Sequence, residues 1–162
     1  MYRLLTALMF VLPAIAATAD PLPLLAGDWT GSGTAREVPE AELDAVRCRI
    51  TNSYAPERLE LTMSGMCVTA GRRLDLSGTI RARDDSAAIS GRWSNPDGLG
   101  EVRIAGHSGE DFVAFTYSAK DPATGRQLDQ NVELRLVGNG FRMRSVDRAD
   151  RSVSMSDITF TR

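Results

Sequence analysis

The chain has 162 residues, with 19 basic and 21 acidic side chains, one histidine and two cysteines. The formal net charge of −2 is spread without long runs of one sign, which argues against nucleic acid or an anionic membrane surface as a partner. A chain of this length is expected to form a single domain with one hydrophobic core.

The first 19 residues are organised like a secretory signal. One basic residue, Arg3, precedes an apolar run over residues 4–16, and the small residues Ala17, Thr18 and Ala19 follow. The run contains a proline and is shorter than the ~20 residues that a membrane span needs. We therefore expect a Sec-type signal peptide over residues 1–19, and a mature domain over residues 20–162 in a bacterial periplasm or the medium.

Short alternating runs of apolar and polar residues fill the rest of the chain, with almost no helical period. The first expected strand contains Trp29. Nine further strands are predicted around residues 46–50, 59–63, 74–80, 89–93, 102–104, 112–119, 132–136, 141–143 and 153–160. Four glycines near strand ends, at positions 65, 78, 91 and 106, indicate places where strands bend or approach closely.

Two segments depart from regular alternation. In the last run, Val153 and Met155 share one parity whereas Ile158 and Phe160 share the other, which predicts a β-bulge near residues 156–157. Residues 39–44 begin with proline and carry acidic residues, a pattern that indicates a helix of one or two turns.

Turn residues separate the later runs, at positions 95–98, 108–111, 121–125 and 138–140. Eight to ten strands joined in sequence by short loops predict an all-β fold, an antiparallel up-and-down β-barrel. A β-sandwich is the alternative.

Both cysteines fall on the inward face of one predicted hairpin. If Cys48 pairs directly with Cys67, then Tyr54 faces Leu61 and the turn falls at residues 56–59, where a proline is favourable. In an oxidising compartment this placement predicts a structural disulfide. A redox pair would have closer C-x-x-C spacing, and a zinc site would need more ligands than one histidine can add.

No stretch of the sequence has the spacing of a catalytic or cofactor-binding motif. The segment around His107 and Ser108 superficially resembles a nucleophile elbow, but that motif would require glycine at position 110, which is Glu110. Paired acidic residues fall in predicted turns among arginines, as expected for solvated loops. We expect a protein that is not an enzyme and has no cofactor or metal.

Residues 25–33, LAGDWTGSG, resemble the opening of the calycin-like barrels, the lipocalin and avidin relatives, where a Trp on the first strand plugs one end. The resemblance implies this role for Trp29. The whole chain is also similar to a group of small exported proteins of Gram-negative bacteria that share its GSGxA, VRCR, GRWSNPDG and DPATGR segments. That group has no settled activity.

A calycin-like barrel implies a monomer that binds a small apolar ligand in its mouth. The aromatic candidates for lining such a site, which could equally be core residues, are Trp29, Trp93, Phe112, Phe115 and Tyr117.

A protein-interaction module or an envelope structural protein is the alternative. Exported inhibitors of metalloproteases resemble this chain in being small barrels with an early hairpin closed by one disulfide, and residues 20–24 could then be the inhibitory arm or simply a tether. A ligand carrier should retain a cavity, whereas an inhibitor should have a filled core and a mobile arm.

Overall fold

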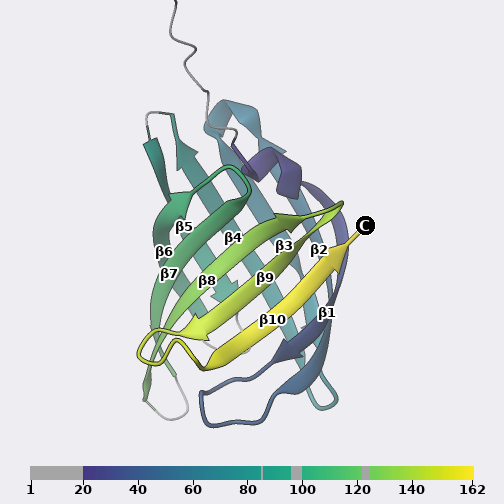
Figure 1. The fold of residues 1–162 in the computed structure, drawn as a ribbon, viewed down its shortest axis with the longest axis vertical. Helices are drawn as coiled ribbons and strands as arrows, with labels where there is room; N and C mark the ends of the chain where they lie inside the picture. Colours follow the sequence, from purple (N-terminus) through teal and green to yellow (C-terminus); the bar gives the residue numbers. More distant parts are fainter. Residues whose placement is uncertain (1–19, 85, 96–99, 122–124) are drawn as a thin grey trace, which may run out of the picture.

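The structure is a computed structural model that describes residues 20–84, 86–95, 100–121 and 125–162. The predicted signal segment and parts of the predicted turns at 95–98 and 121–125 lie outside these residues. Within them, ten antiparallel strands follow one another around a closed barrel, and the first strand pairs with the last (Figure 1). The strands are β1 (Gly27–Ala35), β2 (Asp44–Ala55), β3 (Glu60–Val68), β4 (Arg73–Arg83), β5 (Ser86–Asn95), β6 (Gly100–Ser108), β7 (Phe112–Lys120), β8 (Gln127–Val137), β9 (Gly140–Asp147) and β10 (Ser154–Thr161). The predicted up-and-down barrel is confirmed, and the sandwich alternative is wrong.

Alternation along each strand sends every second side chain into the barrel. In β2, Val46, Cys48 and Ile50 are buried and the arginines between them are exposed. In β10 the register shifts between Ser154 and Ser156, so one extra residue is accommodated opposite β9. The predicted bulge is therefore present, about one residue earlier than expected, and it keeps the apolar residues on both sides of it inside.

Inward-facing glycines allow neighbouring strands to approach closely, as predicted. A Cβ atom on Gly91 would lie 1.8 Å from the carbonyl oxygen of Thr79, and one on Gly106 would lie 1.9 Å from that of Ala114. Any larger residue would push the strands apart. These positions therefore set the local coiling of the barrel wall.

The helix predicted over residues 39–44 is wrong. The segment forms a turn, in which the amide of Ala41 donates a 3.0 Å hydrogen bond to the carbonyl of Val38. A helix this short gains too few backbone hydrogen bonds to offset its nucleation cost. The helices of the described residues are two short 3₁₀ segments, η1 (Leu22–Leu25) and η2 (Pro56–Arg58).

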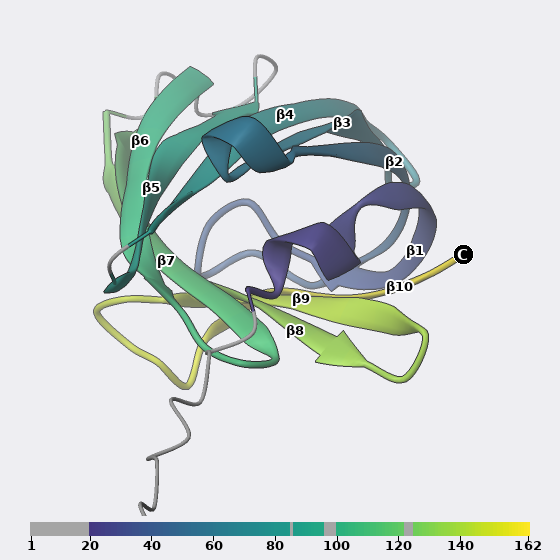
Figure 2. The ribbon, with the colours of Figure 1, turned by 90° about the horizontal axis from the view of Figure 1, so that it is seen from above.

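Residues 20–25, here called the plug, enter one end of the barrel. Viewed from above, η1 lies inside the ring of strands (Figure 2). Leu22 and Leu25 are almost fully buried, and the Leu25 carbonyl accepts hydrogen bonds from the Trp29 indole (3.0 Å) and the Asn52 amide (2.8 Å). Tyr54 donates a hydrogen bond to Asp20 at 3.1 Å. The plug thus closes this end with apolar side chains and with hydrogen bonds from Trp29, Asn52 and Tyr54, while the Asn52 Oδ1 is buried without a partner among the described residues.

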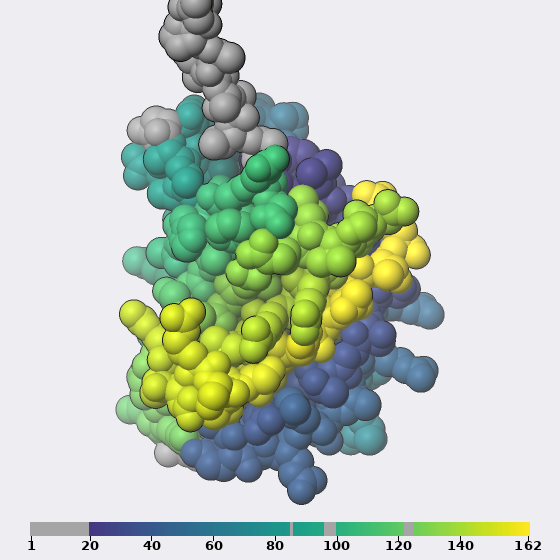
Figure 3. All heavy atoms as spheres, viewed as in Figure 1, coloured from purple at the N-terminus to yellow at the C-terminus, as the bar shows by residue number. Residues whose placement is uncertain are grey.

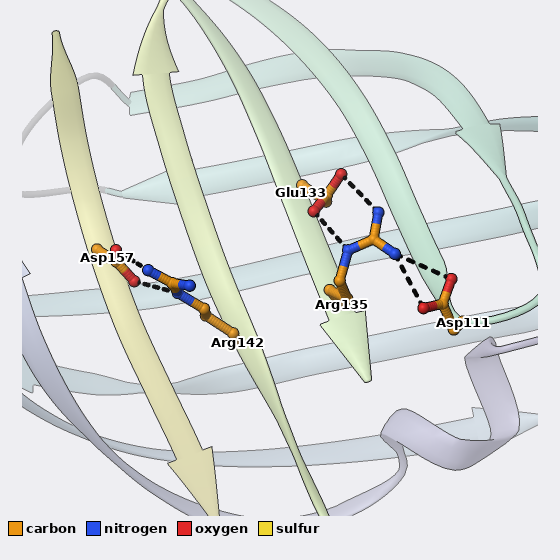
Figure 4. A network of polar contacts seen from close by, with 5 residues as sticks. All are labelled: Asp111, Glu133, Arg135, Arg142 and Asp157. Carbon is orange, nitrogen blue, oxygen red and sulfur yellow. Dashed lines mark hydrogen bonds and ion pairs between the residues drawn. The ribbon is translucent and has the colours of Figure 1, made fainter. Parts of the chain in front are cut away.

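The outer face carries ion pairs between neighbouring strands. Arg142 on β9 forms a two-pronged pair with Asp157 on β10, and Arg135 on β8 bonds both Glu133 and Asp111 (Figure 4). Hydrogen bonding from Arg142 lowers the pKa of Asp157. Strands β8 to β10 and the adjoining β1 form one continuous surface in Figure 3. We assign these pairs to solubility and strand register, because exposed ion pairs contribute little stability.

Candidate functional site

A cavity of about 700 Å³ occupies the end of the barrel opposite the plug. It is bounded by inward-facing residues of the strands and by the loops that join β1 to β2 and β3 to β4. We call this end the mouth; the β1–β2 loop is drawn at the lower end of the barrel in Figure 1. Pockets for small molecules have volumes of about 300 to 1,000 Å³, so the cavity is large enough for a ligand.

The walls of the cavity are mostly apolar. The apolar side chains that the strands contribute are Ala35, Val46, Cys67, Leu74, Leu76, Trp93, Leu128, Val132, Met143, Met155 and Ile158. They come from both sides of the barrel, so an occupant would be surrounded rather than held against one wall. Such a surface favours a ligand with an apolar body.

Uncharged polar groups are set among these walls. Tyr117 on β7 lies directly opposite Gln130 on β8, and both line the cavity. Burial raises the pKa of the Tyr117 hydroxyl, which therefore stays protonated. Ser145 and Ser156 share a hydrogen bond of 2.7 Å on the far side, from β9 and β10. The cavity can thus offer hydrogen bonds to an occupant without offering charge.

Among the residues that the structure describes, the charged ones that line the cavity all lie around the mouth. They lie in the loops or at a strand end, and they are Arg36, Glu37, Glu42, Asp44, Arg72 and Asp121. Arg72 forms an ion pair with Glu37, and the Arg36 guanidinium donates a 3.1 Å hydrogen bond to the Pro39 carbonyl. Four acidic residues and two basic ones give this rim an acidic balance.

The β1–β2 loop, residues 36–43, extends over the mouth and is fixed on both sides. Glu37 pairs with Arg72 beside β4, and Glu40 accepts two hydrogen bonds, at 2.6 and 2.7 Å, from Arg126 beside β8. The Arg126 pair lowers the pKa of Glu40. Val38 and Ala41 of the same loop line the cavity. The loop is therefore an apolar cover held by two surface ion pairs.

Two of the five aromatic residues proposed from the sequence line the cavity, namely Trp93 and Tyr117. Trp29 is buried instead at the plug end, where its ring meets Phe141 at a centroid distance of 5.2 Å.

The other two aromatic candidates, Phe115 and Phe112, do not line the cavity either. Phe115 belongs to the packed core beneath the cavity, with its ring centroid 6.2 Å from that of Trp93. Phe112 has the opposite parity from Phe115, so its ring lies on the outer face under the Arg135 guanidinium. Strand parity therefore explains why Phe112 does not reach the interior.

Cys48 and Cys67 form the predicted disulfide, and they lie directly opposite each other across β2 and β3. Tyr54 faces Leu61 as expected, and the turn falls at η2 with Leu59 in a left-handed conformation (φ 49°). Cys67 also lines the cavity. The bridge therefore braces the wall of the candidate site itself.

Sequence reasoning missed the polar members of the site. Asn95, Gln130 and Ser145 all line the cavity, and Gln130 is only 8% exposed. A usable signal was present, because Gln130 sits on the same parity as Leu128 and Val132. A polar residue at an inward position of a strand is a candidate binding group.

His107 lies near the end of β6 on the exposed face, with its ring against Phe112 at 5.6 Å between centroids. Over the described ranges, no three His, Cys, Asp or Glu side chains are grouped so that they could hold a metal ion. In the same part of the chain, no helix has the length and apolar character needed to cross a membrane.

No protein-family model matches the sequence, and a search of curated proteins returned no significant match. The cavity therefore has to be interpreted from its own geometry and chemistry.

Proposed function

We propose that this protein is an exported, non-enzymatic carrier that binds a small apolar ligand inside its barrel. The observation that carries this proposal is the cavity of about 700 Å³, which has apolar walls and lies in a barrel sealed at its other end. A barrel built only for rigidity would gain stability by filling this space, because unfilled core volume lowers stability.

The packing of the plug favours a carrier over an inhibitor. Residues 20–24, the candidate inhibitory arm, include Pro21 and Leu22, which are buried in the end of the barrel. Release of this segment into a protease cleft would expose both side chains and break the bond from Tyr54 to Asp20. A retained cavity and a packed N-terminal segment are together the combination expected of a carrier.

The calycin-like resemblance is part of the same proposal. In its support, Trp29 follows a short 3₁₀ segment and seals one end of an up-and-down barrel. The barrel has ten strands in the described residues, whereas lipocalins have eight, so the likeness concerns the opening segment and the general architecture.

Export is proposed from the sequence of the first 19 residues and is consistent with the Cys48–Cys67 disulfide, since such bonds persist in oxidising compartments. The intact mass of the purified protein tests it. We expect a chain of residues 20–162, and a chain that still begins at Met1 would exclude cleavage.

Ligand binding is tested with N-phenyl-1-naphthylamine, an uncharged probe whose fluorescence rises in apolar surroundings. We expect saturable binding with one site per barrel. Val132→Phe should weaken it at least about tenfold, because the added ring enters the cavity that Val132 lines.

A matched control lies on the same strand. Val137 is 53% exposed at the plug end of β8, so Val137→Phe should leave probe binding unchanged. Native mass spectrometry of protein purified from its own host should also reveal a retained small molecule. Absence of saturable probe binding, or equal binding by the two variants, would refute the carrier function.

A further inference from the structure

Resting on the proposed carrier function, we infer that the ligand is electrically neutral and carries a hydrogen-bonding polar group that enters the barrel and meets Tyr117 and Gln130. An alcohol or a primary amide on an apolar body has this chemistry. The inference starts from the distribution of charge and polarity along the cavity.

Tyr117 and Gln130 form a built polar site. They are direct cross-strand neighbours, and both face inward among Val132, Leu128 and Trp93. Gln130 is more than nine-tenths buried, and burial also raises the pKa of the Tyr117 hydroxyl beside it. Polar groups in apolar surroundings are favourable only when they are hydrogen-bonded, so this position is suited to an occupant that bonds with both side chains.

The chemistry of the pair favours an uncharged group. A phenol and a carboxamide can each donate and accept, so together they match a hydroxyl or an amide, which also does both. Asn95 adds a buried side-chain oxygen without a partner, and that oxygen requires a donor. A carboxylate can only accept.

Charge at the mouth opposes a fatty-acid anion. The acidic balance of the rim repels an entering carboxylate, and Arg72 is already paired with Glu37. Arg36 bonds the Pro39 carbonyl through one nitrogen, while its buried Nε has no partner among the described residues, so Arg36 is the rim group that an anion would have to use. Deeper in the cavity, the lining residues from the described strands are uncharged beyond Asp44 at the start of β2. An ionised group taken to that depth would lose its hydration without a counter-charge.

The experiment compares ligands that share one ten-carbon chain and differ at the end group. The ligands are 1-decanol, decanamide, decanoate and decyltrimethylammonium, and each displaces N-phenyl-1-naphthylamine at pH 7.5. We expect the alcohol and the amide to bind at least about tenfold more tightly than either ion.

Two conservative variants then locate the polar group. Tyr117→Phe and Gln130→Leu should each weaken decanol about five- to tenfold, the loss that corresponds to one hydrogen bond. Gln127→Leu is the matched control, because Gln127 is exposed at the start of the same strand. It should leave decanol affinity unchanged, and circular dichroism should show the same fold for all three variants.

The outcomes separate this inference from the carrier function. If decanoate binds as tightly as decanol and Arg36→Gln removes that binding, the ligand is an anion held by Arg36 and the inference is overturned. Preferential binding of the ammonium compound would overturn it as well. In both cases the cavity would still be a carrier site, whereas failure of the probe itself to bind would refute the carrier function.

Discussion

Truncation of Trp29 tests how the closed end of the barrel is held together. The side chain is 3% exposed, packs edge-on against Phe141, donates a hydrogen bond to the Leu25 carbonyl, and lies under the Arg162 guanidinium at 4.6 Å from the ring centre. Trp29→Ala removes all of these contacts and leaves a void between the plug and the core.

The expected loss in free energy of unfolding can be estimated from these contacts. Truncation of a large buried aromatic residue costs about 3 to 5 kcal/mol, and we place Trp29→Ala in the upper half of that range because an edge-on ring pair and a buried hydrogen bond are lost together. Leu25 keeps its bond from Asn52, so its carbonyl is not left without a partner. Trp29→Phe should cost about 1 to 2 kcal/mol, since most of the ring packing survives.

Urea unfolding followed by far-ultraviolet circular dichroism measures both variants, because the signal does not depend on the tryptophan itself. Trp93 provides the comparison: it is half-buried beside the cavity, and Trp93→Ala should cost only about 1 to 2 kcal/mol. A loss below about 1 kcal/mol for Trp29→Ala, or an equal loss for both tryptophans, would show that the plug does not seal the barrel.

Three further predictions follow from the wall and the mouth. The double variant Cys48→Ser/Cys67→Ser should lose about 3 kcal/mol of stability, because the disulfide closes a loop with a sequence separation of 19. A thiol titration of the denatured, unreduced wild type should detect no free thiol, and two titratable thiols would contradict the disulfide. Gly91→Ala should lower the free energy of unfolding by at least about 2 kcal/mol, because the added Cβ would clash with the Thr79 carbonyl. Gly71→Ala, where a Cβ would have no atom within 4 Å, should change it by less than about 0.5 kcal/mol, and equal melting temperatures for the two variants would refute the close approach. Because the bond from Arg126 lowers the Glu40 pKa, the ion pair is intact above the ordinary pKa of 4.5 and is lost as the pH falls through the lowered pKa. Release of the fluorescent probe, measured by stopped flow, should therefore accelerate at acidic pH, and Glu40→Gln should release the probe up to about fivefold faster than the wild type at pH 7. A release rate that does not change with pH would contradict this.

The hairpin containing the disulfide was predictable in detail. Parity placed Cys48 and Cys67 on one face, and the proline at position 56 located the turn, so only one register satisfied both conditions. Barrel architecture followed from the number of alternating runs and the shortness of their connections. These local patterns match the folded protein because each strand has one face toward solvent and one face toward the barrel interior.

The site was predictable only in part, and the reasons are physical. Phe112 was grouped with Phe115 and Tyr117 as aromatic, although its parity places it on the outer face. The plug was not foreseen, because a proline-rich segment without periodicity gives no sign of what its leucines contact. Whether an interior is filled depends on how inward side chains from many strands meet, which no single strand reveals.

The pairing of the first strand, β1, with the last, β10, also determines when the fold can be completed. Thr30 and Thr161 pair at a sequence separation of 131, whereas the other ladders join strands that are consecutive along the chain. Hairpins can therefore form from nearby residues, but β1 keeps an unpaired edge until the final strand arrives, and the entropy of closing so long a loop makes this pairing late. Arg162, which follows β10, bonds the Ala26 carbonyl and covers Trp29, so ring closure and sealing of the plug end become a single late event. A polypeptide that crosses a membrane unfolded would thus keep its cavity unformed until it has reached the far side.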